Sequence, residues 1–186
     1  MVVMEETKQK IARNLDAQFA AMGFAAPGVD ALREGADVSL RTLYKYYRSR
    51  EAMVAGALEH RNEVYLAWIS GGPESGPEHS LYVFEKLGEW LGQVANTGCL
   101  FLNALAAYPD DPNVRAIAEH HKDCVRRDFA ARLARIAPGA ETAELSEALL
   151  TIHEGQTDTA MVRGPEIATK SALRLARALL KSEGLL

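Results

Sequence analysis

Residues 24–53, with the sequence FAAPGVDALREGADVSLRTLYKYYRSREAM, constrain the fold of this chain more than any other segment. They predict two short helices joined by a tight turn, then an aromatic and basic run and the start of a third helix. Asp37 occupies the turn, since Asp tolerates left-handed backbone better than most residues, and Ser39 is the expected N-cap that follows. The apolar face of the first short helix consists of Val29, Leu32 and Ala36. The pattern is that of a helix-turn-helix, which places one helix in the major groove of DNA.

Helical spacing continues on both sides of this segment. Ile11, Leu15 and Phe19 recur at intervals of four and form one apolar stripe, which Gly23 ends as a C-cap. Ser49 is the expected N-cap of a long helix over residues 50–69. Residues 71–78, GGPESGPE, cannot continue that helix and read as a linker. Beyond the linker, turn signals separate five more helical stretches at 78–95, 98–108, 112–136, 141–163 and 165–182.

Strand signals are nearly absent, so the sequence predicts an all-α fold of about nine helices. We expect a helix-turn-helix domain over residues 1–50, a connecting helix over 50–69 and a second helical domain over 70–186. Charge is distributed unevenly between these parts. The chain has a net charge of −4, but residues 1–62 hold nine basic and eight acidic side chains, and residues 39–50 hold four basic ones and no acid. A local basic patch dominates its surroundings over about 8 to 10 Å at physiological salt, so it can still bind phosphate.

Composition excludes several other classes. Hydrophobic residues make up 48% and charged residues 25% of the chain, as in ordinary globular proteins. The two cysteines are too few for a disulfide scaffold. The start of the chain lacks the pattern of a signal peptide, and no apolar run is long enough to cross a bilayer. We therefore expect a cytoplasmic protein without a membrane partner.

The segment VSLRTLYKYYRSREAM resembles the helix-turn-helix of TetR-type bacterial transcriptional regulators. Upstream, GVDALREGA is similar to the first helix of that motif, and the resemblance covers residues 8–58. Two departures occur: Asp37 stands where the family usually has glycine, and Leu40 and Arg41 replace its commoner small or lysine residues. The resemblance implies a DNA-binding regulator that is not an enzyme, with DNA contacts from Ser39, Leu40, Arg41, Thr42, Tyr44, Lys45, Tyr46 and Arg50.

Each contact has a physical reason. The Arg41 side chain has the donors to bind guanine O6 and N7, while Leu40 or the Thr42 methyl group fits a thymine methyl group. Tyr44, Lys45 and Tyr46 match positions that contact phosphates in the family, and Arg50 adds charge beside a helix start. Leu43 and Tyr47 are four residues apart and are expected to face inward.

Residues 98–122, GCLFLNALAAYPDDPNVRAIAEHHK, resemble more weakly the ligand domain of one TetR subgroup. The family implies a body that binds a small-molecule effector and forms a homodimer through its last two helices. The expected dimer residues are Leu145, Leu149, Ile152, Gln156, Ile167, Ser171, Leu175 and Leu179. The expected pocket residues are Phe84, Trp90, Leu91, Phe101, Leu105, Tyr108, His121, Cys124 and Met161, each of which is also a plausible core residue. The leading hypothesis is a repressor that the effector releases from double-stranded operator DNA.

Two alternatives stay open. His120, His121 and Cys124 form a short cluster that suits a metal or thiol sensor, or an enzyme built on a helical bundle. No known catalytic motif accompanies it, and a metal site needs more converging ligands, so we expect no metal and no cofactor. The other alternative is a helical adaptor whose helix-turn-helix binds protein.

Overall fold

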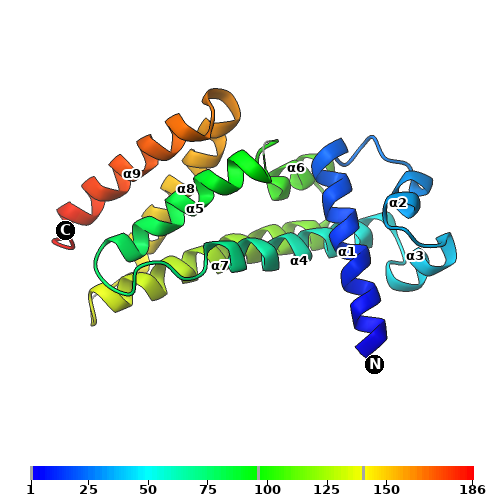
Figure 1. The fold of residues 1–186 in the computed structure, drawn as a ribbon, viewed down its shortest axis with the longest axis horizontal. Coiled ribbons are helices and arrows are strands. Elements are labelled where there is room, and N and C mark those ends of the chain that lie inside the picture. The colour runs from blue at the N-terminus through cyan, green and yellow to red at the C-terminus, as the bar shows by residue number, and fades with distance from the viewer. Residues whose placement is uncertain (1, 96, 140) are drawn as a thin grey trace. The chain divides into compact units, whose positions relative to one another are not determined.

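The computed structural model describes residues 2–95, 97–139 and 141–186. In this part of the chain every regular element is a helix, which confirms the predicted all-α fold (Figure 1). The nine helices that it contains are α1 (Val2–Met22), α2 (Val29–Gly35), α3 (Leu40–Tyr46), α4 (Arg50–Ile69), α5 (Glu78–Gln93), α6 (Leu100–Ala107), α7 (Pro112–Ile136), α8 (Ala143–Arg163) and α9 (Pro165–Ser182). No described helix combines the length and apolar character that crossing a membrane requires.

The caps of the N-terminal helices follow the sequence closely. Gly23 adopts φ 72° and donates its N–H to the Phe19 carbonyl, which ends α1 as predicted. Asp37 has φ 54°, so the turn residue does adopt left-handed backbone. Ser39 Oγ accepts the Thr42 N–H at 3.1 Å and caps α3. Local side-chain chemistry therefore sets where the helices of the predicted motif begin and end.

Three other boundaries differ from the predicted ones by two residues. Helix α5 ends at Gln93 instead of 95, and α6 begins at Leu100 instead of 98. Gly98 has φ 88°, a left-handed conformation that keeps it out of α6. Helix α8 begins at Ala143 instead of 141, because the Glu141 carboxylate accepts the Ala143 N–H at 3.0 Å from outside the helix.

Packing divides the chain into two compact units. Unit 1 comprises Met1–Tyr65 and Cys99–His120, and unit 2 comprises Leu66–Gly98 and His121–Leu186. Helix α6 thus packs within unit 1, together with the N-terminal helices. Packing units and functional domains need not coincide, so the functional division near residues 50–70 stays a prediction.

The core of unit 1 holds α3 in place. Leu43 of α3 is fully buried in a cluster that includes the stripe on α1 and the apolar face of α4. Tyr47 follows α3 and packs against Gly56 of α4, where an added Cβ would lie only 2.3 Å from the tyrosine ring. The burial of Leu43 and Tyr47 confirms that both face inward. Their burial leaves the opposite side of α3 to solvent.

A buried ion pair also joins α1 to α4 in unit 1. Arg61 donates from Nε to the Asp16 carboxylate at 2.7 Å, and its Nη2 lies 2.6 Å from the same oxygen. His60 Nδ1 lies 3.0 Å from the other carboxylate oxygen. Both oxygens of the buried Asp16 are therefore partnered, which is the condition under which a buried charge is tolerated.

Unit 2 is built around α8 and α9, which lie side by side with α5 (Figure 1). Gly88 of α5 allows close approach, because an added Cβ would meet Thr169 Oγ1 at 2.2 Å. Arg132 of α7 donates to the carbonyls of Ile69, Gly71 and His79. That set of bonds fixes the end of α4, the linker and the start of α5 on α7.

Unit 2 also contains a paired carboxylate at Glu154. Burial by itself raises the pKa of this side chain, but the hydrogen bond and charge of His153 and the charge of Lys122 lower it to about 2. His153 Nδ1 lies 2.9 Å from one carboxylate oxygen, and the Lys122 ammonium binds the other. The pair links α7 to α8.

Candidate nucleic-acid interface

Helix α3 presents one exposed face built from its own residues and the turn that follows. Leu40 is 41% and Tyr44 is 42% exposed. The side chains that share this exposed surface, here called the α3 face, are Leu40, Arg41, Tyr44, Lys45 and Arg48. Tyr46 lies at its margin and is half-buried. The α3 face is therefore accessible to a partner, while the side chains that hold α3 in place are buried.

The hydroxyl groups at the start of α3 are tied to each other. Ser39 Oγ and Thr42 Oγ1 lie 2.8 Å apart, and Ser39 Oγ also accepts the Thr42 N–H. Thr42 is half-buried, whereas Leu40 is exposed. The longer side chains of the α3 face consequently reach farther from the protein than either hydroxyl.

Three cations on the α3 face are unpaired. Arg41 and Arg48 make no hydrogen bond or ion pair with any residue that the structure describes. The Lys45 ammonium lies 5.4 Å from the centre of the Tyr46 ring, a cation–π contact that leaves its donors unoccupied. Sequence reasoning did not assign Arg48 to the site, although its position in the basic run Arg48–Arg50 was a usable signal.

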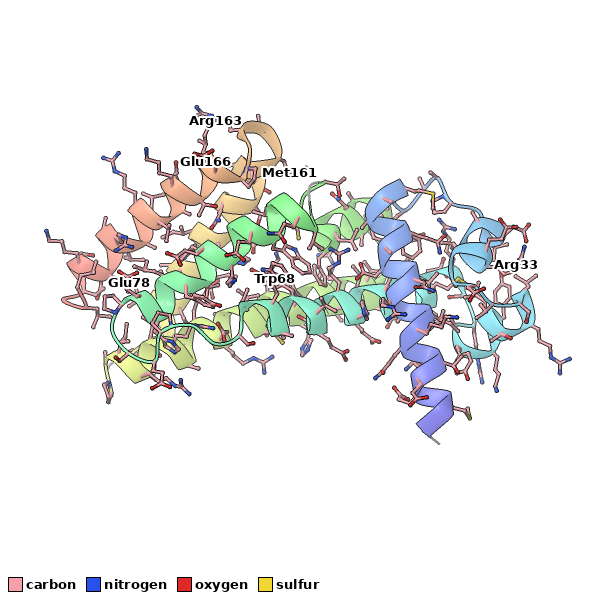
Figure 2. All side chains as sticks on the ribbon, viewed as in Figure 1. Arg33, Trp68, Glu78, Met161, Arg163 and Glu166 are labelled. Carbon is pink, nitrogen blue, oxygen red and sulfur yellow. The ribbon has the colours of Figure 1, made fainter. Side chains whose placement is uncertain are left out.

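Nearby acids, by contrast, are neutralised within unit 1. Lys10 of α1 donates to the Asp37 carboxylate at 2.8 Å, and this hydrogen bond holds the pKa of Asp37 below its usual value. Arg33, which projects from α2 in Figure 2, bonds Glu34 at 2.9 Å and lies 3.8 Å from Asp30. Asp37 is thereby neutralised, while Arg33 offsets one of the two charges of Asp30 and Glu34. The unpaired cations then dominate its local potential.

The Arg50 side chain has hydrogen-bond partners inside the protein that the sequence did not suggest. Its guanidinium donates to the carbonyls of Phe24 and Pro27, and its Nε donates to Tyr108 Oη at 2.9 Å. All three guanidinium nitrogens are thus occupied inside unit 1, where they tie the α1–α2 loop to the end of α6. Three of its five N–H donors therefore already have partners inside unit 1, and its contact with phosphate stays a prediction.

The predicted pocket residues fall into both compact units. Phe101, Leu105 and Tyr108 pack against the core of unit 1. The other six belong to unit 2 and are Phe84, Trp90, Leu91, His121, Cys124 and Met161. Met161 is exposed and covers Gly98, where an added Cβ would lie 2.2 Å from its sulfur (Figure 2). A common cavity for these residues stays a prediction.

Two of the predicted dimer residues lie in the interior of a single chain. Gln156 is 2% exposed and donates from Nε2 to the Phe84 carbonyl and to Thr169 Oγ1, both at 2.9 Å. Leu149 is fully buried. Both side chains therefore stabilise the packing of α5, α8 and α9 and are not available to a second copy.

The remaining dimer candidates are more accessible. On α9, Ile167, Ser171 and Leu175 are exposed, with Leu175 at 58%, while Leu179 is half-buried. On α8, Leu145 and Ile152 are half-buried. The sequence did not single out Ala148, Gly155 and Val162, which with Ile152 and Thr159 recur every three or four positions along α8. Gly155 is exposed and Val162 is 85% exposed, while Ala148 and Thr159 are half-buried.

The histidine and cysteine cluster gains no support as a metal site. His120 is exposed, His121 is buried and Cys124 is half-buried, and Cys124 Sγ accepts a weak hydrogen bond from Arg127. Among the described residues no three His, Cys, Asp or Glu side chains lie close enough to hold a metal ion.

Comparison with known proteins identifies the fold. No protein-family model and no curated protein matches the chain. Solved structures match it over nearly their full length. A TetR-family transcriptional regulator from Streptomyces coelicolor superposes with a TM-score of 0.81 at 20% identity, covering 96% of each chain. A TetR transcription regulator from Haloarcula marismortui gives 0.80 at 15% identity, covering 96% of this chain and 98% of that one.

A putative TetR-type regulator from Streptomyces avermitilis gives a TM-score of 0.79 at 21% identity, covering 97% of this chain and 99% of that chain. Each of the three matches covers at least 96% of this chain. The chain has the fold of the TetR-family transcriptional regulators.

Proposed function

We propose that this protein is a DNA-binding transcriptional regulator that reads an operator with the α3 face. The observation that carries the proposal is the set of cations at Arg41, Lys45 and Arg48, which have no ion-pair partner among the described residues, beside an Asp37 that Lys10 neutralises. Cations on a helix-turn-helix are free to release counterions from phosphates and to bond base edges. The TetR-like fold and the motif at residues 38–53 support the same interpretation.

The proposed regulator acts in the cytoplasm as a homodimer, because a palindromic operator requires two reading heads about 34 Å apart. The exposed stripes on α8 and α9 are the proposed contact between the two copies. Small residues such as Gly155 and Ala148 allow close helix approach there. The molar mass in solution tests this point: a dimer that Leu175→Glu converts to a folded monomer supports it, and a monomeric wild type contradicts it.

Regulation by a small molecule completes the proposal. An effector that binds the second domain more tightly in the DNA-free state releases the repressor, and by linkage operator DNA weakens effector binding by the same factor. The predicted pocket residues are the candidates for that site.

The test is binding of the full-length protein to DNA that flanks its own gene, followed by fluorescence anisotropy at several salt concentrations. We expect sequence-dependent binding whose affinity falls with salt, and a loss of at least about tenfold in Arg41→Ala with Lys45→Ala at unchanged fold. Arg127→Ala with Arg135→Ala, on the exposed surface of α7 and outside the proposed dimer stripes, is the matched control and keeps the affinity. Binding to a protein partner in place of DNA, or no salt-sensitive binding at all, contradicts the proposal.

A further inference from the structure

The α3 face offers hydrogen-bond donors and almost no acceptors. Arg41, Lys45 and Arg48 carry only N–H donors. Residues 38–50 contain no Asn, Gln, Asp or Glu. The hydroxyls of Ser39 and Thr42 are engaged with each other and with the helix backbone. Apart from the Tyr44 hydroxyl, which can donate or accept, this surface therefore suits base edges that present acceptors.

This restriction distinguishes between the four bases in the major groove. Adenine is read by an amide side chain that accepts from N6 and donates to N7, and cytosine is read by an acceptor for its N4 amino group. The α3 face has no amide or carboxylate side chain, and its exposed acceptor is the Tyr44 hydroxyl. Guanine presents two acceptors, O6 and N7, which match the paired donors of an arginine. The chemistry thus favours guanine over adenine and cytosine.

Arg41 is the side chain best placed for this contact. It has no partner among the described residues, and the acids near it in the sequence are held by others, Asp37 by Lys10 and Glu34 by Arg33. Lys45 is drawn toward the Tyr46 ring and lies one turn farther along the helix. The Arg41 fork is consequently the free bidentate donor nearest the leading edge of α3.

The structure also decides between the two side chains that suit a thymine methyl group. Leu40 is 41% exposed, whereas Thr42 is half-buried and its hydroxyl bonds back to Ser39. Leu40 therefore provides the apolar contact. Because Leu40 and Arg41 are consecutive residues, the bases that they contact lie close together in the operator.

We infer that each operator half-site contains a guanine read by Arg41 through O6 and N7, with a thymine methyl group against Leu40 at a nearby base pair. This inference depends on the proposed function and goes beyond it, because it names the bases that fix the binding site. The unpaired Arg48 adds affinity through phosphate, without preference for any base.

The experiment begins with selection of binding sites from a random DNA pool by the full-length protein. The enriched site is then rebuilt with single-atom changes: 7-deazaguanine, which lacks the N7 acceptor, and deoxyuridine, which lacks the thymine methyl group. Wild-type protein is expected to lose about tenfold in affinity with 7-deazaguanine and about fourfold with deoxyuridine.

Matched variants assign each loss to a residue. Arg41→Ala is expected to bind guanine and 7-deazaguanine equally, and Leu40→Ala to bind thymine and uracil equally while still distinguishing 7-deazaguanine. Arg48→Ala is the control: it weakens all sites alike, lowers the salt dependence by about one ion and keeps both preferences. Circular dichroism confirms that each variant is folded.

Failure of the inference differs from failure of the proposed function. A site that is enriched without a guanine, or an Arg41→Ala variant that keeps its sensitivity to 7-deazaguanine, overturns the assignment of Arg41. A Leu40→Ala variant that still distinguishes thymine from uracil overturns the assignment of Leu40. A pool from which no sequence is enriched contradicts DNA recognition itself.

Discussion

The α3 face and the interior of the protein use the same charged side chains in opposite ways. On the α3 face, Arg41 has no partner in the described chain, whereas Arg50, nine positions later, has three. In unit 2, Glu154 is likewise held by both His153 and Lys122. Partner number, and not residue type, separates the groups that are free to bind from the groups that hold the fold. The comparison predicts that stability and DNA binding respond to different substitutions.

The largest expected effect is on stability at Arg50. Arg50→Ala leaves two loop carbonyls and the Tyr108 hydroxyl without their donor, so we expect the free energy of unfolding to fall by about 3 kcal/mol. Arg41→Ala removes an unpaired surface group and is expected to change it by less than about 0.5 kcal/mol. Urea unfolding of both variants measures the two changes in the free energy of unfolding. Equal losses at the two positions would remove the distinction between face and interior.

A second effect of similar size concerns pH and Glu154. Its pKa is lowered to about 2 from an ordinary 4.5, so the folded state holds the carboxylate ionised. The unfolded chain takes up a proton first, and stability is lost as pH falls from 4.5 toward 2, by up to about 3 kcal/mol. Glu154→Gln removes this titration and is expected to give a shallower loss over that range. Urea unfolding at several pH values measures the slope, and identical slopes in both proteins would contradict the assignment.

The smallest expected effect is at Lys10, which neutralises Asp37 beside the α3 face. Lys10→Ala leaves that carboxylate as a local negative charge, so we expect DNA affinity to fall about two- to threefold at low salt, without a measurable change in stability. Adding Asp37→Asn removes the charge and is expected to restore the affinity. If the double variant binds as weakly as Lys10→Ala, the lysine acts on DNA directly.

The fold was largely predictable from the sequence because its signals are local. The apolar stripe on α1, the cap at Ser39 and the left-handed residue Asp37 each depend on a few neighbouring side chains. Helix α4 was predicted at its observed bounds for the same reason, since Ser49 caps its start by accepting the Ala52 N–H. Where a boundary moved, as at α8, a side chain outside the helix had taken the role of the cap.

The candidate site was less predictable because partners that are distant in sequence decide it. Arg50 is predicted to contact phosphate, but the sequence does not reveal that it also bonds the α1–α2 loop and Tyr108. Gln156 has a polar side chain at a helix position that suits an interface, yet it bonds to α5 and α9 inside one chain. The hydrophobic periodicity of one helix does not show which neighbouring helix covers a given side chain.

The lack of space for a side chain at Gly56 affects how this protein can evolve, as well as how it packs. Because the Tyr47 ring occupies the space where a side chain at position 56 would begin, even alanine there pushes the ring aside. Tyr47 ends α3, so a single methyl group on α4 displaces the side chain that anchors this helix without touching any residue of the α3 face. If the proposed function holds, a change at this buried position is a route by which operator preference drifts.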